Sequence, residues 1–243
     1  MTDDRAEILD LFDLCGQRKY LNTAEARRFL AAARTLPTPQ RLFCEVLFYT
    51  GCRISEALEL TPRRLDRDDK RIIFRTLKRR KLTYRAVPVP TRLLRDLVAL
   101  ARLAEHASGP PQRAIPSAIS EPPSPLAPVN PGDQAEEAPA RHPVSHHAQP
   151  EPHTPRADST APLFPWCRVT GWRIVKGVME QARIDGPQAT ARGLRHQFGV
   201  HAVEVQIPEP MLQRWMGHAR ARTTRIYTVF EGSEERKWAK RMW

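Results

Sequence analysis

The sequence predicts a mainly α fold with one small antiparallel β-sheet, an α+β arrangement that is interrupted by a long proline-rich insertion. Apolar residues recur at helical spacing over most of the chain. Two strand-like runs, 71–76 and 84–89, flank a basic stretch, which predicts a hairpin with a positively charged tip. Between Pro110 and Pro165 lie 15 of the 23 prolines, so the insertion divides the folded domain in two.

The predicted parts of the chain are an N-terminal helix or tail, a first folded part, a disordered insertion and a second folded part, at 1–19, 20–107, 108–160 and 161–243. The insertion holds three arginines and six acidic residues and therefore has a net charge of −3. Because the whole chain carries +12, the folded parts carry +15. Such a concentration of positive charge favours a polyanionic partner, and nucleic acid first.

Other classes of protein fit the composition less well. The most apolar stretch, 42–49, is too short to span a membrane and contains Glu45. No signal peptide is expected from the first residues. The four cysteines form no CxxC pair, which argues against a disulfide framework and a zinc ribbon. We therefore expect a cytoplasmic, nucleoid-associated protein with no membrane partner and no metal site.

Four helices are expected before the insertion, at 24–34, 38–48, 53–60 and 91–105. Asn22 and Thr23 can cap the first of these helices, and Thr38 opens the second. The third follows the turn at Gly51, which places Arg53 near a helix N-terminus. Ahead of them, the first segment is predicted as one amphipathic helix from its apolar residues Ile8, Leu9, Leu11, Phe12 and Leu14.

Further helices are expected after the insertion, at 170–183, 191–205, 209–216 and 223–230. The final stretch, 231–243, mixes charged residues with Trp238, Met242 and Trp243 and predicts an amphipathic tail helix. Its docking site is either a neighbouring subunit or its own domain, and the sequence leaves both open.

Several short motifs follow one another in a fixed order: Thr50-Gly-Cys-Arg-Ile-Ser-Glu-Ala-Leu58, the hairpin residue Lys78, Gly193-Leu-Arg-His196, Gly217-His218 and, nine residues later, Tyr227. This series resembles the signature of the tyrosine recombinases, the phage integrase family. The resemblance runs from about residue 20 to the end, outside the insertion, and includes Thr223-Thr224 before the tyrosine. It implies the catalytic-domain fold of that family and a site-specific recombinase or integrase acting on mobile DNA.

The resemblance also implies roles for the matching residues. Arg53 and Arg195 correspond to the two arginines that clamp the scissile phosphate, for which the planar donor fork of arginine is suited. His218 corresponds to a histidine that donates a hydrogen bond to a phosphate oxygen. Tyr227 corresponds to the nucleophile, which forms a 3′-phosphotyrosyl bond and releases a 5′ hydroxyl, so no metal or other cofactor is required. Taken alone, Arg53 would more simply pair with Glu56 on a helix surface.

The basic hairpin tip supplies the general acid and further DNA contacts in this interpretation. The family's lysine, which protonates the leaving 5′ oxygen, falls on Lys78, with Lys81 as the alternative because the tip is longer than usual. Arg79 and Arg80, together with Lys81, are expected to bind the DNA backbone.

One position departs from the family pattern. Arg192 stands three residues before Arg195, where the family usually has a histidine. An arginine can still donate to the phosphate, but it cannot accept the tyrosine proton at neutral pH, so any general base lies elsewhere. His196 is a less favoured candidate for the later histidine, and His201 is expected to be structural.

The favoured function is therefore DNA breakage and rejoining in integration, excision or resolution. A type IB topoisomerase-like relaxase and a catalytically silent DNA-binding regulator are the alternatives. The expected partners are double-stranded DNA and further copies of the chain, forming a homo-tetramer on DNA. About twenty residues precede the catalytic match, too few for the separate core-binding domain of the family, so an accessory recombinase or DNA-binding protein is also expected.

Overall fold

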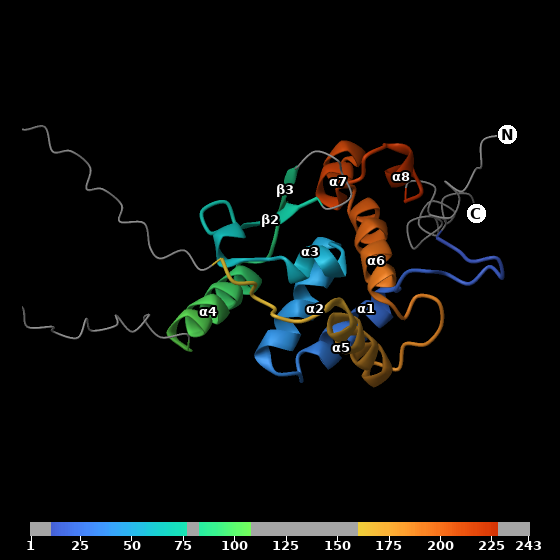
Figure 1. Ribbon diagram of the computed structural model, residues 1–243. Coiled ribbons are helices and arrows are strands. Elements are labelled where there is room, and N and C mark those ends of the chain that lie inside the picture. The colour runs from blue at the N-terminus through green and yellow to red at the C-terminus, as the bar shows by residue number, and fades with distance from the viewer. Residues whose placement is uncertain (1–10, 77–82, 108–159, 228–243) are drawn as a thin grey trace, which may run out of the picture. The chain divides into compact units, whose positions relative to one another are not determined.

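A computed structural model describes residues 11–76, 83–107 and 160–227, which belong to one compact unit (Figure 1). The predicted α+β class is confirmed. Before residue 108 the elements are α1 (Thr23–Ala33), α2 (Thr38–Thr50), α3 (Ile54–Leu58), the 3-10 turn η1 (Pro62–Arg64), β1 (Leu65–Asp66), β2 (Arg71–Arg75), β3 (Tyr84–Pro88) and α4 (Thr91–Ala107). After residue 159 they are α5 (Arg168–Gln181), α6 (Ala191–Glu204), α7 (Glu209–Met216) and α8 (Arg222–Arg225). The predicted insertion, 108–160, lies almost wholly outside the described residues.

Local capping explains why the helix limits lie close to the predicted ones. Asn22 Oδ1 accepts a hydrogen bond from the Glu25 N–H at 2.8 Å, and Glu25 Oε2 accepts one from the Asn22 N–H at 2.9 Å. This reciprocal capping box satisfies two N–H groups that the first turn of α1 leaves without partners. The second helix, α2, continues to Thr50 and ends where Gly51 adopts φ 58°, a left-handed conformation that glycine tolerates.

The sheet has the order β1-β2-β3, and both pairs are antiparallel. The register of β2 and β3 runs from Arg71 opposite Pro88 to Arg75 opposite Tyr84. Strand alternation turns Ile72 and Phe74 of β2, and Arg85 and Val87 of β3, to the buried side. The strand β1 was not predicted because two residues are too few for an alternating pattern. The predicted hairpin tip, 77–82, lies outside the described residues.

Two hydrophobic clusters hold the helices together. The larger one joins α1, α2, α4, α5 and the inner face of the sheet around Phe29, Phe43 and Phe164. The smaller one lies between α6 and α7 and includes Tyr20 and Tyr227. In Figure 1, α6 runs beside α7 and α8, so the smaller cluster is formed where these C-terminal helices meet.

The N-terminal helix prediction was wrong for residues 11–19. A bridge between Phe12 and Arg18 closes a loop there, and Asp13 Oδ1 accepts hydrogen bonds from the N–H groups of Cys15 and Gln17. Gly16 takes φ 73°, which a regular helix does not allow. The sequence Asp-x-x-Gly is a turn signal that outweighed the apolar spacing. Residues 1–10 and the expected tail helix lie outside the described residues.

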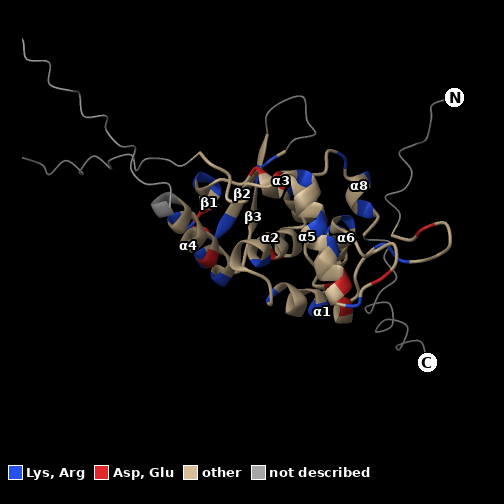
Figure 2. Ribbon diagram, turned by 60° about the horizontal axis from the view of Figure 1, so that its bottom comes forward, with Lys and Arg blue, Asp and Glu red and all other residues tan. Residues whose placement is uncertain are grey.

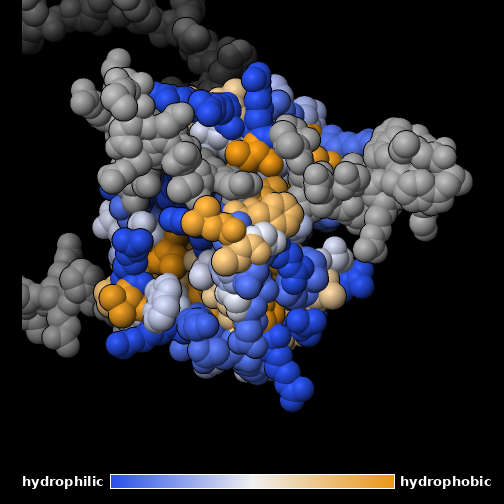
Figure 3. Space-filling model, turned by 90° about the vertical axis from the view of Figure 1, so that its right-hand side faces the viewer, coloured by the Kyte–Doolittle hydropathy of each residue, from blue (hydrophilic) through white to orange (hydrophobic). Residues whose placement is uncertain are grey.

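The described helices include none that is long and apolar enough to cross a membrane. The face shown in Figure 3 is mostly hydrophilic, with some apolar side chains exposed among the charged ones.

Candidate active site

Arg53 is the residue that precedes α3, as the sequence predicted. Its backbone N–H donates to Glu56 Oε2 at 2.8 Å, and its Nη1 donates to Glu56 Oε1 at 3.0 Å. Glu56 is buried and also receives the guanidinium of Arg85. Burial acts to raise the pKa of Glu56, but the hydrogen bonds and charge of Arg85, and then those of Arg53, bring it below its ordinary value. An anionic Glu56 therefore holds Arg53 in place.

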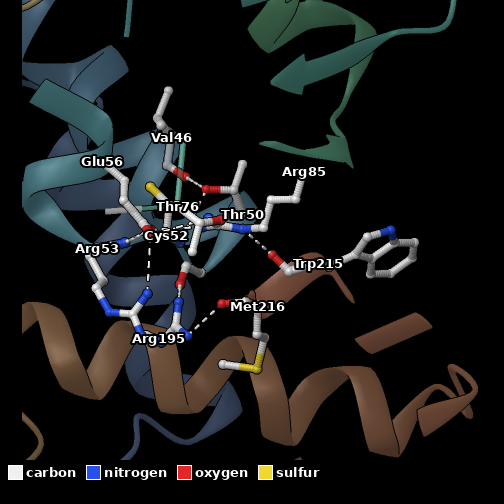
Figure 4. Close-up of polar contacts among 11 residues, drawn as sticks. Val46, Thr50, Cys52, Arg53, Glu56, Thr76, Arg85, Arg195, Trp215 and Met216 are labelled. Atoms are coloured by element: carbon white, nitrogen blue, oxygen red, sulfur yellow. Dashed lines mark hydrogen bonds and ion pairs between the residues drawn. The ribbon is translucent and has the colours of Figure 1, made fainter. Parts of the chain in front are cut away.

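Arg195 projects from α6 and joins the ends of two other helices. Its Nη1 donates to the carbonyl oxygen of Gly51 at 2.6 Å, and its Nη2 donates to that of Met216 at 2.7 Å. These oxygens lie at the C-terminal ends of α2 and α7, where carbonyl groups have no partner within their own helix. Burial, and then the charge of Arg53, lower the pKa of Arg195 to about 10. Figure 4 shows the two guanidinium groups beside each other.

His218 follows Gly217, which ends α7 with φ 67°. The imidazole is buried, and its Nδ1 lies 3.0 Å from Thr224 Oγ1. Burial, and then the charges of Arg195 and Arg53, lower the pKa of His218 to about 3, so the ring is neutral at pH 7. When Thr224 donates to Nδ1, the ring hydrogen is on Nε2, which is then available as a hydrogen-bond donor.

Tyr227 packs against α6 with only 1% of its surface exposed. Its hydroxyl oxygen lies 3.1 Å from His196 Nδ1, and its ring is parallel to that of His218 at a centroid distance of 6.4 Å. A Cβ on Gly199 would lie 2.5 Å from the tyrosine ring, so this glycine is needed for the close approach. Burial raises the pKa of Tyr227 to about 12, although Arg195 and Arg53 act to lower it. The phenol is therefore protonated in the DNA-free protein.

The profile of the phage integrase family matches residues 19–111 and 160–232. The chain belongs to the phage integrase family. The resemblance inferred from the order of the motifs is thereby confirmed.

Relatives with curated names agree with this assignment. An "Integrase/recombinase" of Escherichia coli is 31% identical over 202 residues, covering 77% of this chain and 53% of the relative. The tyrosine recombinase XerD of Xanthomonas campestris pv. campestris is 35% identical over 81 residues, covering 31% of this chain and 25% of the relative. This integrase-family chain thus spans about half the length of the first of these relatives.

Solved structures of the family share the fold. The XerA recombinase superposes with a TM-score of 0.59 at 20% identity, covering 92% of this chain and 62% of that one. The catalytic domain of bacteriophage HP1 integrase has a TM-score of 0.53 at 19% identity, and the match covers 91% of this chain and 93% of that domain. The XerH recombinase, bound to its palindromic difH substrate after cleavage, has a TM-score of 0.60 at 17% identity. The match covers 91% of this chain and 52% of XerH.

Four of the predicted site residues of this integrase-family chain lie together: Arg53, Arg195, His218 and Tyr227. Arg192 lies in the exposed first turn of α6, where its charge contributes to lowering the pKa of His196, after burial and Arg195. The predicted residues Lys78, Arg79, Arg80 and Lys81 lie outside the described residues.

Sequence reasoning missed three residues that support this site. Arg85 lies on the buried side of β3, and an arginine at an inward position of an alternating strand was a signal that it pairs with a buried carboxylate. Thr224 was quoted as part of the tyrosine motif without its contact to His218. His196 was considered for a different role, and its contact with the Tyr227 hydroxyl depends on how α6 meets the segment that follows α8.

The buried histidines predict acid sensitivity of the fold. Burial, and then the charge of Arg195, lower the pKa of His196 from 6.5 to about 4, and they lower the pKa of His218 further. Each histidine has a lower pKa in the folded protein than in the unfolded chain, so the folded state favours the neutral ring. The resulting contribution to the unfolding free energy is fully present above pH 6.5. It is lost as the pH falls toward 4 for His196 and toward 3 for His218. Each histidine contributes at most about 1.4 kcal/mol of unfolding free energy per pH unit in this range.

Urea unfolding at pH 7 and pH 4.5 measures this effect. We expect His196→Asn to reduce the loss of unfolding free energy between these pH values, because an amide does not titrate. His201→Asn, which changes an exposed histidine, is the control and should behave like the parent protein. Equal losses for the parent and His196→Asn would contradict the prediction.

Proposed function

We propose that this chain carries the catalytic part of a site-specific recombinase or integrase that breaks and rejoins DNA through a 3′-phosphotyrosyl intermediate. The observation that supports this most strongly is the convergence of Arg53, Arg195 and His218 around Tyr227. These residues come from four separate elements or their ends, and their types match the needs of phosphoryl transfer: cationic donors, a neutral donor and a nucleophile.

The charge at the site suits a phosphodiester. Three arginines, Arg53, Arg85 and Arg195, surround one carboxylate, Glu56, which leaves a net charge of +2 in this cluster. Arg195 donates to neutral carbonyl groups, so these contacts fix its guanidinium without cancelling its charge. A preformed positive site of this kind stabilises the charge that develops on the non-bridging oxygens.

The reaction that we propose begins when the Tyr227 oxygen attacks the phosphorus. A bond forms between that oxygen and phosphorus, the bond to the 5′ oxygen breaks, and the leaving oxygen takes a proton from Lys78 or Lys81. The neutral His218 donates from Nε2 to a phosphate oxygen, and Arg192 supplies a further donor. As it attacks, the Tyr227 hydroxyl gives its proton to His196 Nδ1, its hydrogen-bond partner, from which the proton passes to water. Arg195 and Arg53 favour the phenolate that forms.

Double-stranded DNA is the partner that we propose. Basic residues occur on α4, α5, α6 and α8, as Figure 2 shows, and they provide the sequence-independent attraction that phosphate backbones require. The XerH recombinase is bound to difH, and the Tn1549 transposon integrase is in complex with transposon DNA. We propose that this chain likewise acts on mobile DNA, as a homo-tetramer and with an accessory recombinase or DNA-binding protein.

A suicide-substrate assay tests the proposal. Duplexes of randomised sequence, nicked close to the cleavage position, lose a short 5′-hydroxyl fragment after cleavage, so the covalent product accumulates. We expect a protein–DNA adduct on a denaturing gel, formed equally well with and without EDTA. DNA binding without an adduct on any substrate would favour the silent regulator. Relaxation of supercoiled DNA by a monomer, without strand exchange, would favour the relaxase.

A further inference from the structure

We propose that Arg85 is a positioning residue of this active centre, which sets Arg53 and His218 relative to each other without touching the phosphate. The inference rests on the proposed function, since it assigns a role within the same site. No motif of the sequence pointed to Arg85, and its role follows from its contacts.

The first contact of Arg85 fixes Glu56. Its Nη1 donates to Glu56 Oε1 at 3.1 Å and its Nη2 donates to Glu56 Oε2 at 2.7 Å. The side chains are 3% and 0% exposed, so this fork meets both oxygens of a carboxylate that water does not reach. Arg53 uses the same two oxygens. The orientation that Arg85 imposes on Glu56 therefore becomes the orientation of Arg53.

The second contact of Arg85 fixes the end of α7. Its Nε donates to the carbonyl oxygen of Trp215 at 2.8 Å, and Arg195 takes the next carbonyl, that of Met216. Gly217 packs directly on the arginine, since a Cβ there would lie 3.1 Å from Arg85 Cδ and Nη1. His218 is the following residue. Arg85 and Arg195 thus fix the C-terminal end of α7 and, with it, the position of His218.

A third contact ties Arg85 to the base of the hairpin. Its Nη1 also lies 3.3 Å from Thr76 Oγ1, and the Thr76 N–H donates to the Thr83 carbonyl oxygen at 2.8 Å. Thr76 and Thr83 flank the segment 77–82, which contains the candidate general acid. The same guanidinium is therefore bonded to Glu56, to Trp215 and to Thr76 at the end of β2, as Figure 4 shows.

These contacts also indicate that Arg85 does not bind the phosphate itself. Four hydrogen bonds engage all three of its nitrogens, and the guanidinium carbon lies 5.2 Å from the centroid of the Phe74 ring. Arg53 is more exposed, and Glu56 is the partner that the described part of the chain provides for its side chain. Arg85 acts through Arg53 and His218.

A double-mutant cycle separates positioning from a general structural role. Arg85→Lys keeps the charge but loses the fork, so we expect single-turnover cleavage of the suicide substrate to slow about 10–100-fold, less than for removal of a direct donor. Arg53→Ala should slow it by about 100–1,000-fold. Because Arg85 acts partly through Arg53, Arg85→Lys should slow the Arg53→Ala variant by a clearly smaller factor than it slows the parent; the part that remains is its effect through His218. Full multiplication of the two effects would overturn the proposal, as would parent-like cleavage by Arg85→Lys.

A matched control and a second variant keep the test decisive. Arg28 also donates to main-chain carbonyls, joining α1 to Ala182 and Arg183, so Arg28→Lys should leave the cleavage rate unchanged. If Arg85→Lys does not fold, Glu56→Gln, which keeps the side-chain volume, takes its place and should show the same dependence on Arg53.

A binding measurement decides the proposal even if the parent protein forms no adduct, a result that would count against the recombinase function alone. When the logarithm of the association constant for duplex DNA is plotted against the logarithm of the salt concentration, loss of one phosphate contact reduces the steepness of the slope by about 0.9. We expect Arg53→Ala and Arg85→Lys each to reduce the slope, and the double variant to reduce it no further. A slope for Arg85→Lys equal to that of the parent would overturn the inference.

Discussion

Tyr227→Phe is expected to abolish the covalent protein–DNA adduct while DNA affinity stays unchanged. The variant keeps the aromatic ring that packs on Gly199 and lies parallel to His218, so the fold is retained. It lacks the oxygen that attacks phosphorus. The loss of the hydroxyl leaves the buried His196 Nδ1 without this partner, which costs about 1–3 kcal/mol of unfolding free energy, less than the total stability of a typical domain.

The matched control is Tyr84→Phe. Tyr84 is 55% exposed on β3, whereas Tyr227 is almost fully buried, so accessibility alone would favour Tyr84 as the reactive tyrosine. Adduct yield on nicked duplexes should be that of the parent for Tyr84→Phe and zero for Tyr227→Phe. An adduct that survives Tyr227→Phe would show that the nucleophile has been assigned to the wrong residue.

Arg195→Ala is expected to slow single-turnover cleavage by about 100–1,000-fold, the effect of removing one preorganised donor from a charged transition state. The geometry explains why a large effect is expected. The guanidinium is held by the carbonyl oxygens of Gly51 and Met216, so it needs no reorganisation when the phosphate arrives. Its charge also lowers the pKa of Tyr227, so its loss removes both phosphate stabilisation and activation of the nucleophile.

Arg195→Ala also leaves two carbonyl groups without their donor, which costs roughly 1–3 kcal/mol for each buried group. The cleavage rates are therefore compared at a temperature where thermal unfolding shows that the variant is folded. The control is Arg34→Ala, at the exposed C-terminal end of α1. Cleavage by Arg195→Ala at the rate of the parent would exclude Arg195 from the phosphate clamp.

The parts of the fold that the sequence predicted well are those that short-range chemistry determines. The start of α1 depends on the cap at Asn22, which the sequence predicted, whereas α2 runs two residues beyond its predicted end, to Thr50 before Gly51. The loop at residues 11–19 was predicted wrongly because the turn formed by Asp13 and Gly16 competed with a helical pattern of apolar residues.

The candidate site was predicted in its residue types but not in its connections. The order of the motifs indicated Arg53, Arg195, His218 and Tyr227, whereas the role of Arg85 depends on β3 meeting both α3 and α7. The cationic groups Arg195 and Arg53 act to lower the pKa of Tyr227. Burial outweighs them in the DNA-free protein, because Tyr227 lies in the smaller hydrophobic cluster, and neither the depth of burial nor its electrostatic cost can be read from a motif.

Identification of the modified residue in the covalent adduct shows whether Tyr227 is the nucleophile. The adduct from a suicide substrate is digested with nuclease and protease, and the peptide that carries the nucleotide is sequenced by tandem mass spectrometry. The chain contains four tyrosines, so the assignment is discriminating. We predict a nucleotide attached through its 3′ phosphate to Tyr227. Attachment to Tyr20, Tyr49 or Tyr84, or to any residue other than Tyr227, would contradict the account.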